Sequence, residues 1–228
     1  MTTINYQIIK PAQRYISSWA GGTTEELFIH PTGAQYRARD FAFRVSTAVV
    51  ELGQSDFTSL PSITRWIATL EGSVRLNHEG HGQTNLEPLH PYCFDGGWTT
   101  RCTGTCTDFN LMLSRGWNGY IAPTPRRFLC AVRETVGIFA FGAPVQVELF
   151  PSYGDISSGI DGAACGGVDG KNTKSTDLDD KNHIHRTIPT ERILLAHRDM
   201  FVLNSPCTVS VSDGCEAQSI LFKAWAEC

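Results

Sequence analysis

The stretch Phe41-Ala-Phe-Arg-Val-Ser-Thr-Ala-Val-Val50 alternates large apolar residues with polar ones over its first half. Successive side chains of a β-strand point to opposite faces of the sheet. A strand here therefore carries its two phenylalanines and Val45 on one face, and Arg44 and Ser46 on the other. The apolar face predicts packing against a core. The polar face lies either in solvent or in a polar cavity.

Similar segments recur along the 228 residues, separated by Gly, Pro, Asn and Asp, and no long helical periodicity interrupts them. This rhythm is typical of antiparallel double-sheet jelly rolls and cupins, and it predicts an all-β chain. Besides the first stretch, the strands that we expect are 65–70, 73–76, 108–113, 128–132, 138–141, 145–149, 193–195, 201–203, 208–211 and 219–223.

The composition is that of a globular protein, with 41% hydrophobic and 18% charged residues and a net charge of −4. Such a chain offers no basic field for a nucleic acid or an anionic membrane. No apolar run reaches the roughly 18 residues that a spanning helix needs. The first residues also lack the apolar region of a secretory signal. We therefore expect a soluble, cytoplasmic protein with neither nucleic acid nor membrane as its partner.

A break in the pattern at residues 115–119, followed by two prolines, separates two β-rich halves, 1–116 and 117–228. Residues 151–186 differ from both halves because they are rich in Gly, Ser, Asp and Asn and poor in large apolar groups. Such a segment buries too little surface to offset the entropy of ordering it. The sequence thus predicts a flexible insertion within the second half.

Six short blocks follow one another in the first half: Ser18–Leu27, Phe43–Ser46, Phe57–Arg65, Leu70–Gly72, Phe94–Gly96 and Asp108–Met112. In this order they resemble the HutD/Ves family of bicupin proteins, which is linked to bacterial histidine utilisation. The resemblance implies two cupin-like double-stranded β-helix (jelly-roll) barrels, 1–116 and 117–228. Because cupin-type proteins often dimerise, it is also compatible with a homodimer.

The candidate site follows from alternation and from the resemblance together. Asp108 and Asn110 share one face of their strand, and the resemblance implies that the polar positions of the matched blocks point into the first barrel. Arginines beside an Asp and an Asn make a cavity suited to a carboxylate. The alternative is an internal Arg–Asp pair that only stabilises the barrel. The candidate ligand-binding residues are Trp19, Thr24, Glu26, Arg44, Ser46, Arg65, Asp108 and Asn110.

The segment Gly21-Gly-Thr-Thr24 has two interpretations. It either leaves backbone N–H groups free as a small anion-binding concavity, or it makes a tight turn into a strand at 27–29. Thr24 and Glu26 match the Thr-x-Glu of the family. Trp19 stands where family members often carry an Asn.

A metal site is the main alternative to a metal-free cavity. His183 and His185, with Glu191 and His197 downstream, have the order of the cupin metal motif. However, the pair ends the predicted insertion, and the first half has no equivalent. The Cys102–Cys106 pair also lacks the second Cys/His pair of a structural zinc site. We therefore expect no metal and no cofactor.

The resemblance implies a metal-free protein that binds a small acidic metabolite of histidine catabolism, similar to formylglutamate, and thereby modulates the pathway. Two other classes stay open. One is a cupin enzyme, either metal-dependent through the four residues above or a metal-free isomerase or hydrolase. The other is an interaction protein with no small-molecule ligand. Phosphate-loop, dinucleotide and nucleophile-elbow signatures are absent from the sequence.

Overall fold

The computed structural model describes residues 4–151, 189–212 and 218–227. In these ranges the chain is almost wholly β, with one 3-10 helix at Pro11–Gln13. The prediction of an all-β chain is confirmed. No helix in the described ranges is long and apolar enough to cross a membrane. The predicted insertion falls almost entirely on residues 152–188, which lie outside the described ranges.

The described strands form four open antiparallel sheets. The six-stranded sheet has the order β2 (Tyr15–Trp19), β3 (Gly22–His30), β4 (Phe43–Val50), β11 (Cys106–Ser114), β6 (Ile63–Glu71), β9 (Tyr92–Asp95). The N-terminal small sheet has the order β5 (Gln54–Asp56), β10 (Thr100–Thr103), β7 (Val74–His78), β8 (Gly82–Leu86). The five-stranded sheet has the order β1 (Tyr6–Ile9), β17 (Met200–Leu203), β14 (Glu134–Ala140), β19 (Ser219–Ala226), β12 (Trp117–Pro123). The C-terminal small sheet has the order β13 (Arg127–Cys130), β18 (Cys207–Val211), β15 (Val145–Pro151), β16 (Glu191–Leu195).

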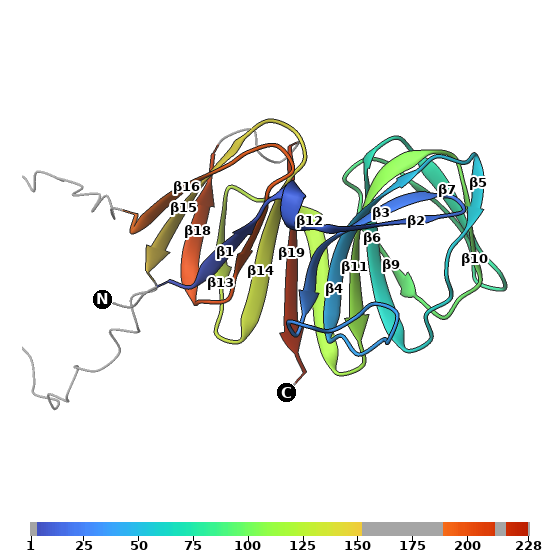
Figure 1. Cartoon of the computed structure of the whole chain (residues 1–228), viewed down its shortest axis with the longest axis horizontal. Coiled ribbons are helices and arrows are strands. Elements are labelled where there is room, and N and C mark those ends of the chain that lie inside the picture. Colours follow the sequence, from blue (N-terminus) through green and yellow to red (C-terminus); the bar gives the residue numbers. More distant parts are fainter. Residues whose placement is uncertain (1–3, 152–188, 213–217, 228) are drawn as a thin grey trace, which may run out of the picture.

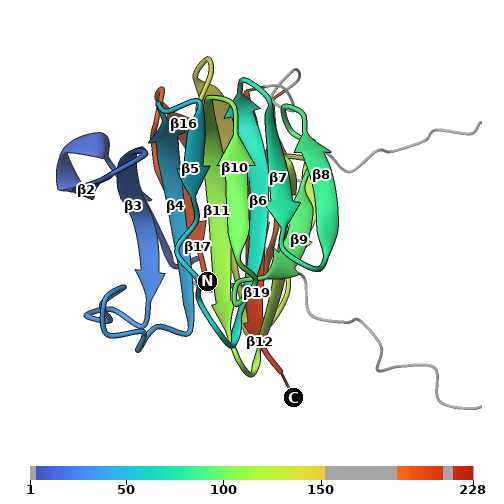
Figure 2. The same ribbon diagram turned by 90° about the vertical axis from the view of Figure 1, so that its right-hand side faces the viewer.

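The four sheets succeed one another along the long axis of the molecule (Figure 1), and the turned view looks onto the N-terminal small sheet (Figure 2). The five-stranded and six-stranded sheets pack on each other through a core that includes Phe43, Phe109 and Phe222. A second core fills the space between the five-stranded sheet and the C-terminal small sheet. Hydrogen bonding closes none of the four sheets into a barrel in the described ladders, so the two cupin-like barrels that the resemblance implies are not confirmed.

The first predicted strand is slightly too long at its start, because β4 begins at Phe43. Phe41 lies before the strand and packs in a small separate core with Leu60 and Ile63. Within β4 the predicted alternation holds: Phe43 and Val45 enter the core between the two large sheets. The opposite face of β4 is therefore free to line a different space.

Ala20 and Gly21 make the tight two-residue turn between β2 and β3, and the residues on either side of it, Trp19 and Gly22, pair with each other. Gly22 has a φ of +153°, and a Cβ on it would lie 1.9 Å from the carbonyl oxygen of Val49. Only glycine avoids this contact. The strand after the turn starts at Gly22, earlier than the predicted Leu27, and places Thr24 and Glu26 beside β4.

Candidate functional site

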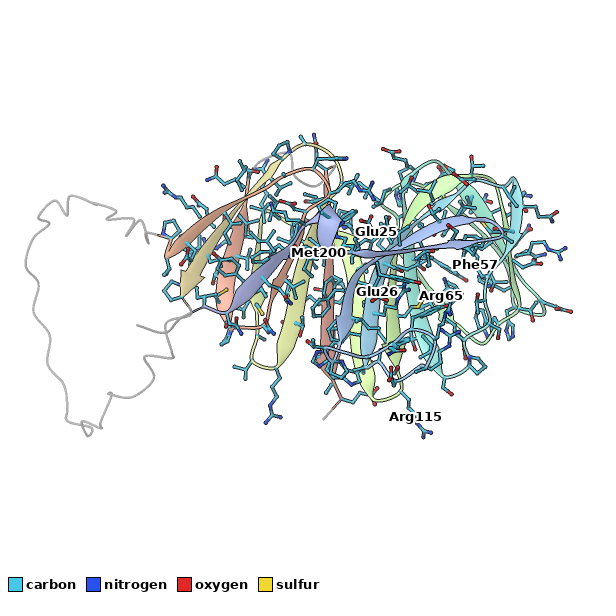
Figure 3. All side chains as sticks on the ribbon, in the orientation of Figure 1. Glu25, Glu26, Phe57, Arg65, Arg115 and Met200 are labelled. Carbon is cyan, nitrogen blue, oxygen red and sulfur yellow. The ribbon has the colours of Figure 1, made fainter. Side chains whose placement is uncertain are left out.

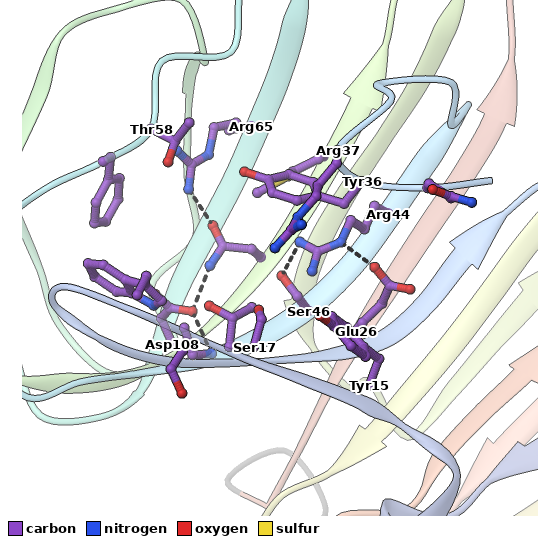
Figure 4. Close-up of a pocket in the computed structure, with 18 of the residues that line it drawn as sticks. Tyr15, Ser17, Glu26, Tyr36, Arg37, Arg44, Ser46, Thr58, Arg65 and Asp108 are labelled. Atoms are coloured by element: carbon purple, nitrogen blue, oxygen red, sulfur yellow. Dashed lines mark hydrogen bonds and ion pairs between the residues drawn. The ribbon is translucent and has the colours of Figure 1, made fainter.

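A cavity of about 630 Å³ lies against the polar face of the six-stranded sheet (Figure 4). The hairpin of β2 and β3, the loop between β3 and β4, and the residues around the end of β5 form its other walls. The structure brings all eight candidate residues to this one cavity: Trp19, Thr24, Glu26, Arg44, Ser46, Arg65, Asp108 and Asn110.

The strand register explains why residues so far apart in the sequence meet here. Residues directly opposite each other in neighbouring strands point to the same face of a sheet. One row places Arg44 of β4 and Arg65 of β6 on either side of Met112 in β11. The next row along the strands places Ser46 beside Asn110. The row after that contains Asp108.

Adjacent glutamates on β3 point to opposite sides of the sheet (Figure 3). Glu26 points toward the cavity, where its Oε2 accepts a hydrogen bond from Arg44 Nε at 2.7 Å. Glu25 is buried on the other side and forms ion pairs with Arg14 and Arg198. These two ion pairs hold β3 against the N-terminal segment and the turn between β16 and β17.

Arg44 is 4% exposed and is held on three sides. Besides the bond to Glu26, its Nη1 donates to Ser46 Oγ at 3.2 Å, and its guanidinium carbon lies 4.4 Å from the centre of the Tyr36 ring. The internal Arg–Asp pair that we considered as an alternative is not what Arg44 forms, because its carboxylate partner is Glu26.

Arg65 is equally buried but has no ion pair with any carboxylate in the described residues. Its Nη2 donates to Asn110 Oδ1 at 3.1 Å, while its Nε is buried and has no partner. The rings of Phe57 and Phe94 lie 4.9 and 5.1 Å from its guanidinium carbon. Burial lowers the pKa of Arg65 to about 10, so the side chain stays cationic at neutral pH. The cavity therefore contains a buried positive charge that no carboxylate of the described residues pairs with directly.

Asp108 is 2% exposed. Its Oδ1 accepts hydrogen bonds from the backbone N–H of Ala48 at 3.1 Å and from Asn110 Nδ2 at 2.6 Å. Burial raises the pKa of Asp108 to about 7, and the charge of Arg65 and these two hydrogen bonds oppose the rise. Both protonation states of this carboxyl group are thus accessible near neutral pH.

Two aromatic residues that shape the cavity are missing from our predicted set. Tyr36 comes from the loop between β3 and β4, where no periodicity shows which way a side chain points. Phe57 follows β5. The sequence feature that could have identified Phe57 is its position in one of the six matched blocks, directly before a polar segment.

The residues of the alternative metal motif are only partly within the described ranges. Glu191 is exposed on β16, and His197 Nδ1 lies 3.0 Å from the carbonyl oxygen of Gly142. His183 and His185 lie outside the described ranges. Among the residues that the structure describes, no group of three or more His, Cys, Asp or Glu side chains is arranged to hold a metal ion.

Fold and cavity together define the class: an all-β, cupin-like protein with a cavity whose lining includes two buried arginines. A solved structure of oxalate decarboxylase from Bacillus subtilis aligns with a TM-score of 0.53 at 7% identity, covering 100% of this chain and 78% of that one. This likeness shows the cupin-like fold alone. The chain belongs to the HutD family, whose family model matches residues 12–156.

Two further solved structures have a similar fold over nearly the whole chain. HutD from Pseudomonas fluorescens SBW25 aligns with a TM-score of 0.67 at 19% identity, covering 98% of this chain and 100% of that one. A conserved protein of unknown function from Pseudomonas aeruginosa PAO1 aligns with a TM-score of 0.65 at 17% identity and the same coverage. No curated protein matches the chain.

Proposed function

We propose that this protein binds a small carboxylate metabolite of histidine catabolism, similar to N-formylglutamate, without a metal, and that binding modulates the pathway. One observation carries the proposal: Arg65 is a buried cation without a directly paired carboxylate among the described residues, and it lines a cavity large enough for a small metabolite. The link to histidine catabolism rests on membership of the HutD family.

A carboxylate ligand suits this cavity because it offers a direct anionic partner to Arg65 and a further acceptor to Arg44. Among the described residues Arg65 donates only to a neutral amide oxygen, and an anionic acceptor in the cavity would compensate its charge with a charge-assisted bond. Arg44 uses its Nε and one terminal nitrogen within the protein, which leaves its other terminal nitrogen for a ligand. Cavities of this volume are typical of small-molecule sites.

The proposal also includes an architecture and a compartment. The six-stranded sheet with the N-terminal small sheet would form the first cupin-like unit of a bicupin, and the remaining two sheets the second, with the division near residue 116. β1 joins the five-stranded sheet of the second unit and ties the N-terminus to it. All five cysteines in the described ranges are free thiols, which suits the reducing cytoplasm.

The direct test is calorimetric titration with N-formylglutamate, glutamate and urocanate. We expect N-formylglutamate to bind, and Arg44→Ala to weaken binding by about 10- to 100-fold through loss of one charge-assisted contact. Arg44→Lys should also weaken it, since an ammonium group cannot make a planar two-point contact. Arg75→Ala, on the exposed face of β7, is the control. Failure of wild-type protein to bind any of the three compounds would contradict the proposal.

Glu26→Gln tests the charge balance of the same cavity. The amide oxygen can still accept the bond from Arg44, but the negative charge that compensates this arginine is gone. We expect N-formylglutamate to bind about 3- to 10-fold more tightly, and the gain to shrink at high salt. Glu148→Gln removes a more exposed Arg–Glu pair in the C-terminal small sheet, away from the cavity, and serves as the control. Weaker binding by Glu26→Gln would mean that its carboxylate contacts the ligand itself.

A further inference from the structure

Asp108 is a buried carboxyl group without a direct cationic partner. Both of its hydrogen bonds in the described structure go to Oδ1 and come from neutral groups, the Ala48 backbone and the Asn110 amide. Arg65 is linked to it only through Asn110, which donates to Asp108 with its nitrogen and accepts from Arg65 with its oxygen (Figure 4). Oδ2 of Asp108 has no hydrogen-bond partner among the described residues.

The charged and titratable groups around Asp108 come from every element that encloses the cavity. They are Tyr15 on β2, Glu26 on β3, Tyr36 and Arg37 in the following loop, Arg44 on β4, Asp56 on β5, Arg65 on β6, Cys102 on β10 and Cys106 on β11.

Among these groups Asp108 is the buried carboxyl group without a direct cationic partner in the described residues. Glu26 is partly exposed and its charge is compensated by Arg44, while Asp56 is largely exposed and pairs with Arg101. Burial raises the pKa of Cys102 to about 11 and that of Cys106 further, so both thiols keep their protons. Arg65 is the main charge that favours the ionised form of Asp108.

A ligand carboxylate on Arg65 would neutralise that charge and place a second anion in the same buried space. Two carboxylates that share a buried site do not both stay ionised, and one of them takes up a proton. We propose that the cavity binds its ligand together with a proton, which Asp108 accepts on its free Oδ2, so that occupancy falls as the pH rises above neutrality. This inference rests on the proposed function.

The pKa of Asp108 in the ligand-free protein supports the uptake, rather than the release, of a proton on binding. Burial raises the pKa of Asp108 to about 7, so in the empty cavity at pH 7.5 the group is largely ionised and able to accept a proton. Loss of the opposing charge of Arg65 raises the pKa further in the complex. Between the two pKa values, binding weakens about tenfold for each pH unit, because one proton must be taken from solution.

The experiment is titration with N-formylglutamate at pH 7.5 in phosphate and in Tris, whose ionisation heats differ. The carboxyl groups of this probe are ionised throughout the range, so any proton taken up belongs to the protein. We expect wild-type protein to take up more than about half a proton per ligand, and its Kd to rise about tenfold from pH 7.5 to 8.5. Asp108→Asn should take up none and show a flat profile. Asp95→Asn, an exposed Asp on β9, should behave as wild type.

The possible outcomes separate the two proposals. Binding by wild-type protein without proton uptake overturns the proton linkage and leaves the proposed function intact. Proton uptake that persists in Asp108→Asn overturns the assignment to Asp108. If wild-type protein does not bind the probe, the proposed function fails and this inference fails with it. The wild-type measurement alone decides the linkage if the variant does not fold.

Discussion

Arg65→Met is expected to reduce binding of N-formylglutamate by at least about 100-fold while changing the melting temperature by less than about 5 °C. Binding falls because the cavity loses the one buried guanidinium that has no carboxylate partner in the described structure. Stability changes little because Arg65 makes no ion pair that would offset the free-energy cost of burying its charge. Methionine has a similar length and can pack between the rings of Phe57 and Phe94.

Arg75→Met is the matched control, since Arg75 is exposed on β7 and does not line the cavity. It should leave both affinity and melting temperature unchanged. The contrary result would be a large fall in the melting temperature of Arg65→Met together with normal affinity of the molecules that remain folded. Arg65 would then be a structural residue, held for its bond to Asn110 and its contacts with the two rings.

Alternation along single strands was enough to predict which side chains share a face of β4 and of β11, whereas the family resemblance implied that this face lines a cavity. Arg44 and Ser46 on β4, and Asp108 and Asn110 on β11, lie where period-two geometry places them, because each strand has one face in the core between the two large sheets. This geometry is local, so it can be derived from about ten residues at a time.

Pairings between strands could not be derived in the same way. Alternation left open whether Arg44 pairs with Asp108, and it gave no reason to prefer Glu26, which lies on β3 directly before a shift of register at Leu27. The position of β1 in the five-stranded sheet could not be predicted either, since its partner strand β17 is nearly 200 residues away in the sequence. The register between distant strands depends on the whole fold rather than on a local pattern.

Loop residues were beyond prediction for a related reason. Tyr36 stacks on Arg44 from a loop whose path is determined by its packing against the sheet, and a loop has no period to read. The burial of Arg65 and Asp108 likewise depends on the six-stranded sheet, the hairpin and the loops that enclose the cavity. Residue types therefore indicated a polar cavity, whereas the missing ion pair of Arg65 and the raised pKa of Asp108 required the structure.

Asp108→Asn is expected to stabilise the ligand-free protein above about pH 7. Burial raises the pKa of Asp108 from its usual 3.8 to about 7, so between these two pH values the folded state holds a proton that the unfolded state has lost. The stability that this proton contributes is fully present below about pH 3.8 and is lost as the pH rises toward 7. The asparagine variant keeps an acceptor for Ala48 and Asn110 and never ionises, so it avoids that loss.

Urea denaturation of both proteins at pH 5, 6, 7 and 8 measures the difference. The stability of the variant relative to wild type should increase from pH 5 to 7 and level off above, with a total gain from acid to neutral pH of at most about 4 kcal/mol. Asp199→Asn is the contrasting control: Asp199 is as buried as Asp108 but pairs with Lys10, so its replacement should lower stability instead. A difference between Asp108→Asn and wild type that stays constant with pH would show that Asp108 is ionised throughout, compensated by the charge of Arg65. The cavity would then hold a permanent ion pair at a distance, and a carboxylate ligand would have to compete with Asp108 for that arginine.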